Sequence, residues 1–293
     1  MTSPAPSSRR TVLQLLVVCL CVVGGVSVVA LGTVDRWVEP GPTTAAVAPL
    51  AEGEDAEELG AVLLPPDTPL EQAQTYDWTT ESLRPPRHRV TYGLGTTLDA
   101  WLEDQHRAFA RRLRYRSLGD ERFTYQAPRG CSADMRCIYE ELIRSNAGPV
   151  KALGERFEAS IRERDLDAAQ AAQLILGFVQ RIHYELPRDE PFGIVPPALV
   201  PARNRGDCDS KAVLAVMLLQ QVGIDAVVLY SDPLAHAAVG VDLPGGRTRL
   251  RYGGRSYQYA EVTTDGWPLG MIPPRYDKPH LWVVLPVGPG VNG

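Results

Sequence analysis

Cys208, His236 and Glu261 have the side chains of a nucleophile, a general base and an orienting acid, in that order along the chain. A thiol can attack a carbonyl carbon once an imidazole has taken its proton, and a carboxylate can hold that imidazole in the useful tautomer. The separations are 28 positions (236 − 208) and 25 positions (261 − 236), so only tertiary folding can bring the three together. Each also has an ordinary structural interpretation, as a buried thiol, a hydrogen-bonded strand-end histidine and an exposed strand carboxylate.

Cys208 lies where the sequence predicts the start of a buried helix. The segment Arg205-Gly206-Asp207-Cys208-Asp209-Ser210-Lys211 is followed by an apolar run over 212–219. Asp207 is suited to the N-cap, Gly206 to the tight turn before it, and Gly223 to the helix end. The positive end of a helix favours thiolate over thiol, so we expect the pKa of Cys208 to lie below the usual value of about 8.5.

The neighbouring segments predict helices first and strands afterwards. The proline-rich stretch 187–204 has no periodicity and is expected to be a loop that leads to Cys208. Gly253-Gly254 predicts a hairpin turn. This order indicates an α+β domain in which helices pack on an antiparallel sheet. Helices are expected over Met135–Ser145, Val150–Arg164 and Leu166–Ile182, and strands over Ala226–Tyr230, His236–Val241, Arg249–Tyr252, Ser256–Thr263 and Leu281–Leu285.

Gly206-Asp207-Cys208 at the head of a buried helix, His236 at the start of a strand, and the segment Glu261–Trp267 resemble the transglutaminase-like superfamily. The resemblance covers roughly residues 174–285. It implies a papain-like core, with the nucleophile on a buried helix packed on an antiparallel β-sheet, and it implies Cys208, His236 and Glu261 as the catalytic residues. Asp is more usual than Glu at the third position, so Asp265 is the fallback acid.

The resemblance implies a cysteine enzyme that cleaves an amide, or transfers its acyl group to an amine, through a thioester. The backbone amide of Cys208 would form the oxyanion hole, with Asn204 as the side-chain candidate. No metal or cofactor is expected. The alternative is a catalytically silent envelope protein that binds a peptide or protein partner in the same cleft. A third hypothesis is a metallohydrolase that uses Cys208, Asp209 and His236.

Composition limits the classes of function. The chain has 293 residues, 44% hydrophobic and 22% charged, which is enough for one good core and a small accessory region. The net charge of −5 argues against a nucleic-acid partner. The basic cluster Arg107, Arg111, Arg112, Arg114 and Arg116 is interpreted as a solvated helix face, with contact to an anionic partner or a membrane surface as the alternative.

The N-terminal region predicts a membrane anchor. Residues 11–34 form an uncharged run of 24 residues (34 − 11 + 1), preceded by Arg9 and Arg10. A bilayer-spanning helix needs about 20 residues, and the arginines favour a cytoplasmic N-terminus. We therefore expect residues 1–10 in the cytoplasm, a single-pass anchor over 11–34, and an extracytoplasmic domain that acts on a peptide or protein in the cell envelope. A cleaved signal peptide, cut after Val28-Val29-Ala30, is the alternative.

The remaining chain is divided by composition. Residues 35–75 are rich in Pro, Ala and Glu and are expected to be a flexible linker. Residues 76–134 are an accessory region or an N-terminal extension, and residues 135–293 form the transglutaminase-like domain. Cys131 and Cys137 are six positions apart and could form a local disulfide if Cys131 precedes the helix that begins near Asp134. Two unlinked thiols are the alternative.

Overall fold

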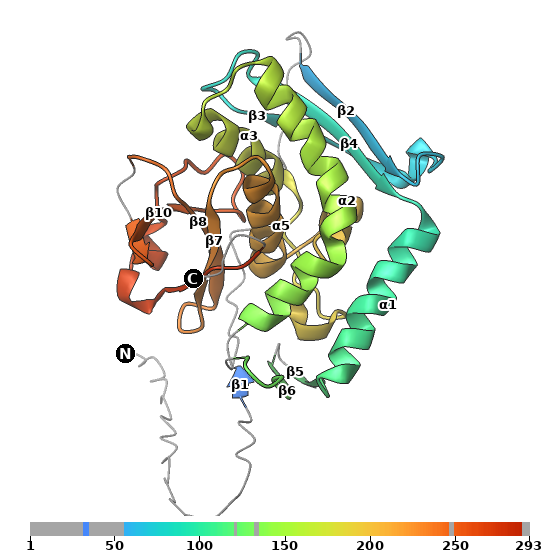
Figure 1. The fold of residues 1–293 in the computed structure, drawn as a ribbon, viewed down its shortest axis with the longest axis vertical. Coiled ribbons are helices and arrows are strands. Elements are labelled where there is room, and N and C mark those ends of the chain that lie inside the picture. The colour runs from blue at the N-terminus through green and yellow to red at the C-terminus, as the bar shows by residue number, and fades with distance from the viewer. Residues whose placement is uncertain (1–31, 35–55, 120–121, 132–134, 246–248, 289–293) are drawn as a thin grey trace, which may run out of the picture.

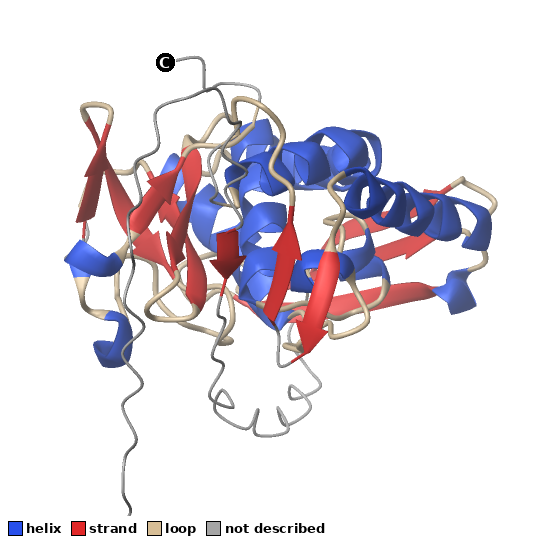
Figure 2. Cartoon of the chain, turned by 90° about the horizontal axis from the view of Figure 1, so that it is seen from below, coloured by secondary structure: helices blue, strands red, loops and turns tan. Residues whose placement is uncertain are grey.

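The computed structural model describes residues 32–34, 56–119, 122–131, 135–245 and 249–288. A layer of helices lies between two β-sheets, with one sheet on each side (Figures 1 and 2). The predicted α+β class is therefore confirmed. The central helices are α2 (Arg136–Glu163), α3 (Ala168–Arg181) and α5 (Cys208–Gln221).

The larger sheet has five antiparallel strands in the order β11-β7-β8-β10-β9. The sequence predicts all five strands. The observed ends of three of them agree with the prediction to within one residue, and the last two strands are two or three residues shorter at one end. Helix α5 packs against β7 and β8 at the centre of this sheet. The strands are β7 (Ala226–Ser231), β8 (His236–Val241), β9 (Arg249–Tyr252), β10 (Arg255–Ala260) and β11 (Val283–Leu285).

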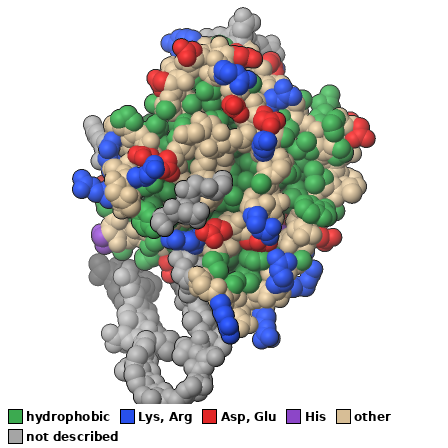
Figure 3. Space-filling view, viewed as in Figure 1, with side chains coloured by type: hydrophobic (Ala, Val, Ile, Leu, Met, Phe, Trp, Pro, Cys, Tyr) green, Lys and Arg blue, Asp and Glu red, His purple; other side chains and the backbone are tan. Residues whose placement is uncertain are grey.

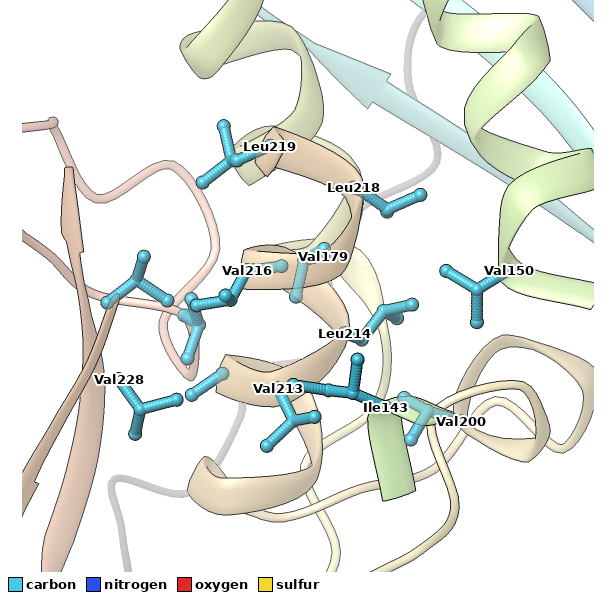
Figure 4. Packing of buried hydrophobic residues seen from close by; sticks show 14 of the residues in the cluster. Ile143, Val150, Val179, Val200, Val213, Leu214, Val216, Leu218, Leu219 and Val228 are labelled. Atoms are coloured by element: carbon cyan, nitrogen blue, oxygen red, sulfur yellow. The ribbon is translucent and has the colours of Figure 1, made fainter. Parts of the chain in front are cut away.

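Helix α5 is buried on every side, as its apolar run predicts. Figure 4 shows its side chains between Ile143 and Val150 on one side and Val228 of β7 on the other. A helix enclosed in this way has little freedom to shift, so the residues at its N-terminus are held in a defined place. The labelled α5 side chains are Val213, Leu214, Val216, Leu218 and Leu219.

Helix α2 runs without a break through Pro149, where the sequence predicted two helices. Proline within a helix costs about 3 kcal/mol through a lost backbone bond and a steric clash. The buried residues on its far side include Val150, Leu153 and Phe157, and each contributes about 1.5–3 kcal/mol by leaving water. Packing of this face outweighs the local cost, so the helix continues.

The second sheet corrects the predicted linker. Strands β2 (Glu57–Leu64), β3 (Ala73–Thr79) and β4 (Arg87–Leu94) pair in the order β2-β4-β3, with β2 parallel to β4. Residues 57–75 are thus largely part of the fold, while residues 35–55 lie outside the described part of the chain. The strand was not predicted because it begins with two acidic residues, Glu57 and Glu58. Its Leu59 and Val62 are buried against the helices.

One continuous core joins this sheet to the helices and to the larger sheet. Tyr92 of β4, Leu142 of α2 and Val213 of α5 belong to the same buried cluster. The predicted boundary between an accessory region and a catalytic domain at residue 134 therefore does not separate two cores.

A third, small sheet has the order β1-β6-β5. Helix α1 (Thr96–Arg112) ends before Arg114, so the basic cluster extends beyond the helix onto β5. Arg and Lys side chains gather over the lower part of α1 and the neighbouring strands (Figure 3). The strands are β1 (Gly32–Val34), β5 (Arg116–Gly119) and β6 (Arg122–Tyr125).

The predicted single-pass membrane arrangement is contradicted. Within the described residues, no helix combines the length and apolar character that crossing a membrane requires. Residues 11–31 of the predicted anchor lie outside the described residues. Its last residues, Gly32–Val34, form β1 and pair with β6 of the folded domain. Residues paired in this way cannot also be the final turn of a spanning helix.

Cys131 and Cys137 form a disulfide, with their Cα atoms 5.9 Å apart. Cys131 precedes α2, which is the arrangement that the local bridge required. Cys208 is outside any disulfide and is buried.

Candidate active site

Cys208 is the first residue of α5, and Asp207 caps the helix as predicted. The Asp207 Oδ1 atom accepts hydrogen bonds from the backbone N–H of Ser210 at 2.9 Å and from its hydroxyl at 2.6 Å. The Ser210 Oγ atom in turn accepts from the backbone N–H of Val195 at 2.9 Å. These bonds tie the helix entrance to the loop before it. The side chain of Cys208 is 1% exposed, so solvent screens the helix N-terminus little at this point.

His236 begins β8, Glu261 follows the last residue of the neighbouring strand β10, and the two side chains contact each other. The His236 Nε2 atom is 3.1 Å from Glu261 Oε2. Strand β10 pairs with β8 so that Ala260 is opposite Val239, which brings the end of β10 close to the start of β8. The ring of Tyr276 stacks on the imidazole with centroids 4.0 Å apart. The imidazole is therefore held at one nitrogen and on one face.

Glu261 is buried and surrounded by hydrogen-bond donors. Its Oε2 also accepts from the Tyr259 hydroxyl at 2.7 Å, and its Oε1 accepts from the Thr263 hydroxyl at 2.7 Å. The backbone N–H groups of Val262 and Thr263 donate to the same Oε1, each at 3.0 Å. Burial would raise the pKa of Glu261, but the charge of His236 and the bonds from His236, Thr263 and Tyr259 outweigh it and lower the pKa to about 2. Glu261 is thus a carboxylate at neutral pH.

The fallback acid, Asp265, has a different partner. It forms an ion pair with Arg181 at 3.1 Å, and its side chain is 43% exposed. The structure therefore brings Glu261, and not Asp265, to the imidazole. The longer side chain of Glu reaches His236 from just beyond the end of β10.

Cys208 lies in the same region as the His236–Glu261 pair. Helix α5 packs against β8, which begins with His236. Burial raises the pKa of both Tyr259 and Tyr276, and the negative charge of Glu261 acts in the same direction. Asp209, the residue after Cys208, lines the same small pocket as His236.

Asp209 contacts the thiol, which the sequence did not indicate. The Cys208 Sγ atom donates a long hydrogen bond to Asp209 Oδ2 at 3.7 Å, and the Tyr139 hydroxyl donates to Asp209 Oδ1. Asp209 is 2% exposed. A buried carboxylate beside a thiol disfavours the thiolate, because both would be negative. Asp209 therefore opposes the helix N-terminus in setting the charge of Cys208.

Of the three metal ligands predicted from the sequence, only Cys208 and Asp209 lie together. Among the described residues, ligand atoms of Asp207, Cys208 and Asp209 lie within 4.8 Å of one another, and His236 is not a member of this cluster. Asp207 already accepts two bonds from Ser210 as the helix cap. These three side chains lie close together because they are the N-cap and the first two residues of α5.

Asn204 fixes the loop that precedes α5. Its backbone has a positive φ of 48°, which Asn tolerates better than most residues. Its Oδ1 accepts from the backbone N–H of His183 at 3.1 Å. This bond joins Asn204 to the second residue after α3, and its role in an oxyanion hole stays a prediction.

A small pocket of about 10 Å³ lies beside His236. Such a volume has room for about one water molecule. Its apolar wall comes from three separate parts of the chain, with Phe123 from β6, Met135 from the residue before α2, and Phe192 from the turn Pro191–Gly193. The pocket is smaller than an amide substrate.

Comparison with protein-family models, curated proteins and solved structures finds no match.

Proposed function

We propose that this chain is a cysteine enzyme of the transglutaminase-like type that acts on amides through a thioester at Cys208. The observation that carries the proposal is the hydrogen bond between His236 and the ionised Glu261, with His236 at the start of β8, the strand against which the Cys208 helix packs. A buried imidazole paired with a carboxylate, on a strand that packs against a helix with a thiol at its N-terminus, suits nucleophilic catalysis.

The roles of the two nitrogens follow from the hydrogen bond. An ionised Glu261 can only accept, so Nε2 donates to it, and Nδ1 is the atom that takes the proton of the Cys208 thiol. In the resting state the thiol donates to Asp209, so its proton must turn from Asp209 to His236 before attack. Glu261 stays ionised and stabilises the imidazolium that forms.

The reaction then proceeds in two halves. The sulfur attacks the carbonyl carbon, and the backbone N–H of Cys208 at the helix N-terminus stabilises the negative oxygen. His236 donates its proton to the leaving amine, the C–N bond breaks, and a thioester remains. Water or an amine attacks the thioester, gives its proton to His236, and releases Cys208 as the thiolate.

The test is acylation by a small activated ester, p-nitrophenyl acetate. We expect one acetyl group on Cys208 of the intact protein by mass spectrometry, no adduct in Cys208→Ser, and slower acylation in His236→Ala. An adduct that forms at the same rate without His236 contradicts the proposal.

A binding protein that uses the same residues is the second candidate. The small pocket beside His236, about 10 Å³ in volume, is the observation that weighs against an amide substrate in this arrangement of the chain. A protein of this kind would show no acetyl group on Cys208 in the experiment above.

A further inference from the structure

Lys211 is a fully buried lysine on the helix that carries Cys208. It lies three residues after the thiol, about one turn further along α5, and is 0% exposed. The surrounding helix is apolar, and a methionine would fill the same space without the cost of burying a charge. A lysine at this position is therefore stable only if its ammonium group has hydrogen-bond partners in the interior.

The ammonium group of Lys211 binds the C-terminal end of α3. Its Nζ donates to the backbone oxygen of Ile182 at 2.6 Å and to that of Gln180 at 3.2 Å. The last carbonyl groups of a helix have no partner within the helix, and the negative end of the helix dipole favours a cation there. Lys211 thus joins the end of α3 to the start of α5.

The side chain of Gln180 extends this connection to the catalytic acid. Its Nε2 donates to the backbone oxygens of Glu261 and Trp267, both at 2.9 Å. Gln180 is 6% exposed, so water competes little for these bonds. Residue 180 is therefore held through its main chain by the thiol helix, and through its side chain it holds the main chain of Glu261.

The charges of Lys211 and Glu261 also interact. Burial lowers the pKa of Lys211 to about 7, and the negative charges of Glu261 and Asp265 oppose that shift. The ammonium and the Glu261 carboxylate consequently stabilise each other in the interior.

We propose that Lys211 is a positioning residue that sets Glu261, and through it His236, relative to the thiol of Cys208. This inference rests on the proposed function. Lys211 itself touches no reacting atom and acts only through Gln180 and Glu261.

The test is a double-mutant cycle on the alkylation rate of Cys208 by iodoacetamide at about pH 6. Lys211→Met removes the ammonium at similar volume, and Gln180→Leu removes the amide donor but keeps the backbone oxygen. We expect each variant to slow alkylation about threefold, and neither to slow it further when Glu261→Gln is already present. Val213→Ala, on the same buried helix, is the control whose effect should multiply with that of Glu261→Gln.

The possible outcomes distinguish failure of the positioning role of Lys211 from failure of the proposed function. If Lys211→Met and Gln180→Leu slow the reaction by the same factor with and without Glu261→Gln, or leave it unchanged, Lys211 is a structural residue only. If Lys211→Met does not fold, Gln180→Leu carries the same expectation alone. If His236→Ala and Glu261→Gln themselves leave alkylation unchanged, the proposed function is wrong, whatever the effect of Lys211→Met.

Discussion

The Nε2 atom of His236 lies 3.1 Å from Oε2 of Glu261, a carboxylate whose pKa is lowered to about 2 by His236, Thr263 and Tyr259 against the opposing effect of burial. Under the proposed function, this contact leaves Nδ1 as the ring nitrogen that accepts the proton of the thiol. Glu261 is the carboxylate that contacts His236, while Asp265 pairs with Arg181.

Replacement of Glu261 by Gln should slow acylation of Cys208 by at least about tenfold, because the amide keeps the shape but loses the charge that stabilises the imidazolium. Stopped-flow acylation with p-nitrophenyl acetate measures this rate. Asp265→Asn is the matched control, and we expect it to stay within about twofold of the parent rate since its partner is Arg181. Equal losses in the two variants would show that Glu261 has no special role.

Replacement of Asp209 by Asn should speed alkylation of Cys208 at about pH 6, by roughly threefold to tenfold, because it removes a negative charge beside the thiol. The Asn oxygen can still accept from the Tyr139 hydroxyl, so the local packing is kept. Rates are measured with iodoacetamide on folded protein, with Cys208→Ser as the blank. A slower reaction would mean that Asp209 assists the thiolate.

Replacement of Phe123 by Ala should open the wall of the cavity beside His236. We expect the rate with a bulky maleimide to rise more than the rate with iodoacetamide, because only the larger reagent is limited by space. Leu118→Ala, in the same small sheet but 49% exposed, is the control. An equal change with both reagents would indicate altered thiol chemistry and no change in access.

Acid should destabilise the protein through His88. Burial, assisted by the charge of Arg164, lowers the pKa of His88 from 6.5 to about 4. Between these values the unfolded chain binds a proton that the folded chain does not, so stability is full above about pH 6.5 and falls as the pH drops. Between pH 7 and pH 5 the loss attributable to His88 is about 2 kcal/mol.

Urea unfolding at the two pH values measures this loss. In His88→Leu the pH dependence should shrink by that amount, while the exposed His280→Gln should leave it unchanged. Part of the dependence should remain in His88→Leu, because burial also lowers the pKa of His106 to about 4. An unchanged pH dependence in His88→Leu would exclude this histidine as the cause.

The local structure around the site could be read from the sequence. Asp207 before an apolar run predicts the cap and the start of α5, and the sequence places β7 to β11 to within three residues. Such patterns are local, because capping groups and strand periodicity involve residues that are neighbours in the chain.

Tertiary structure decided the features that depend on contacts between distant segments. The burial of Leu59 and Val62 made a strand of a segment that looked like a linker, and the core carried α2 through Pro149. The pairing of Gly32–Val34 with β6 overturned the end of the predicted anchor.

The same holds for the chemistry of the site. Cys208, His236 and Glu261 were named from residue type and order, but the choice of Glu261 over Asp265 depends on the register of β8 against β10. The contact of Asp209 with the thiol and the burial of Lys211 have no local signature, since a charged residue in the first turn of a helix is usually exposed. Only the packing of α5 between α3 and the sheet encloses these charges and gives each of them a partner.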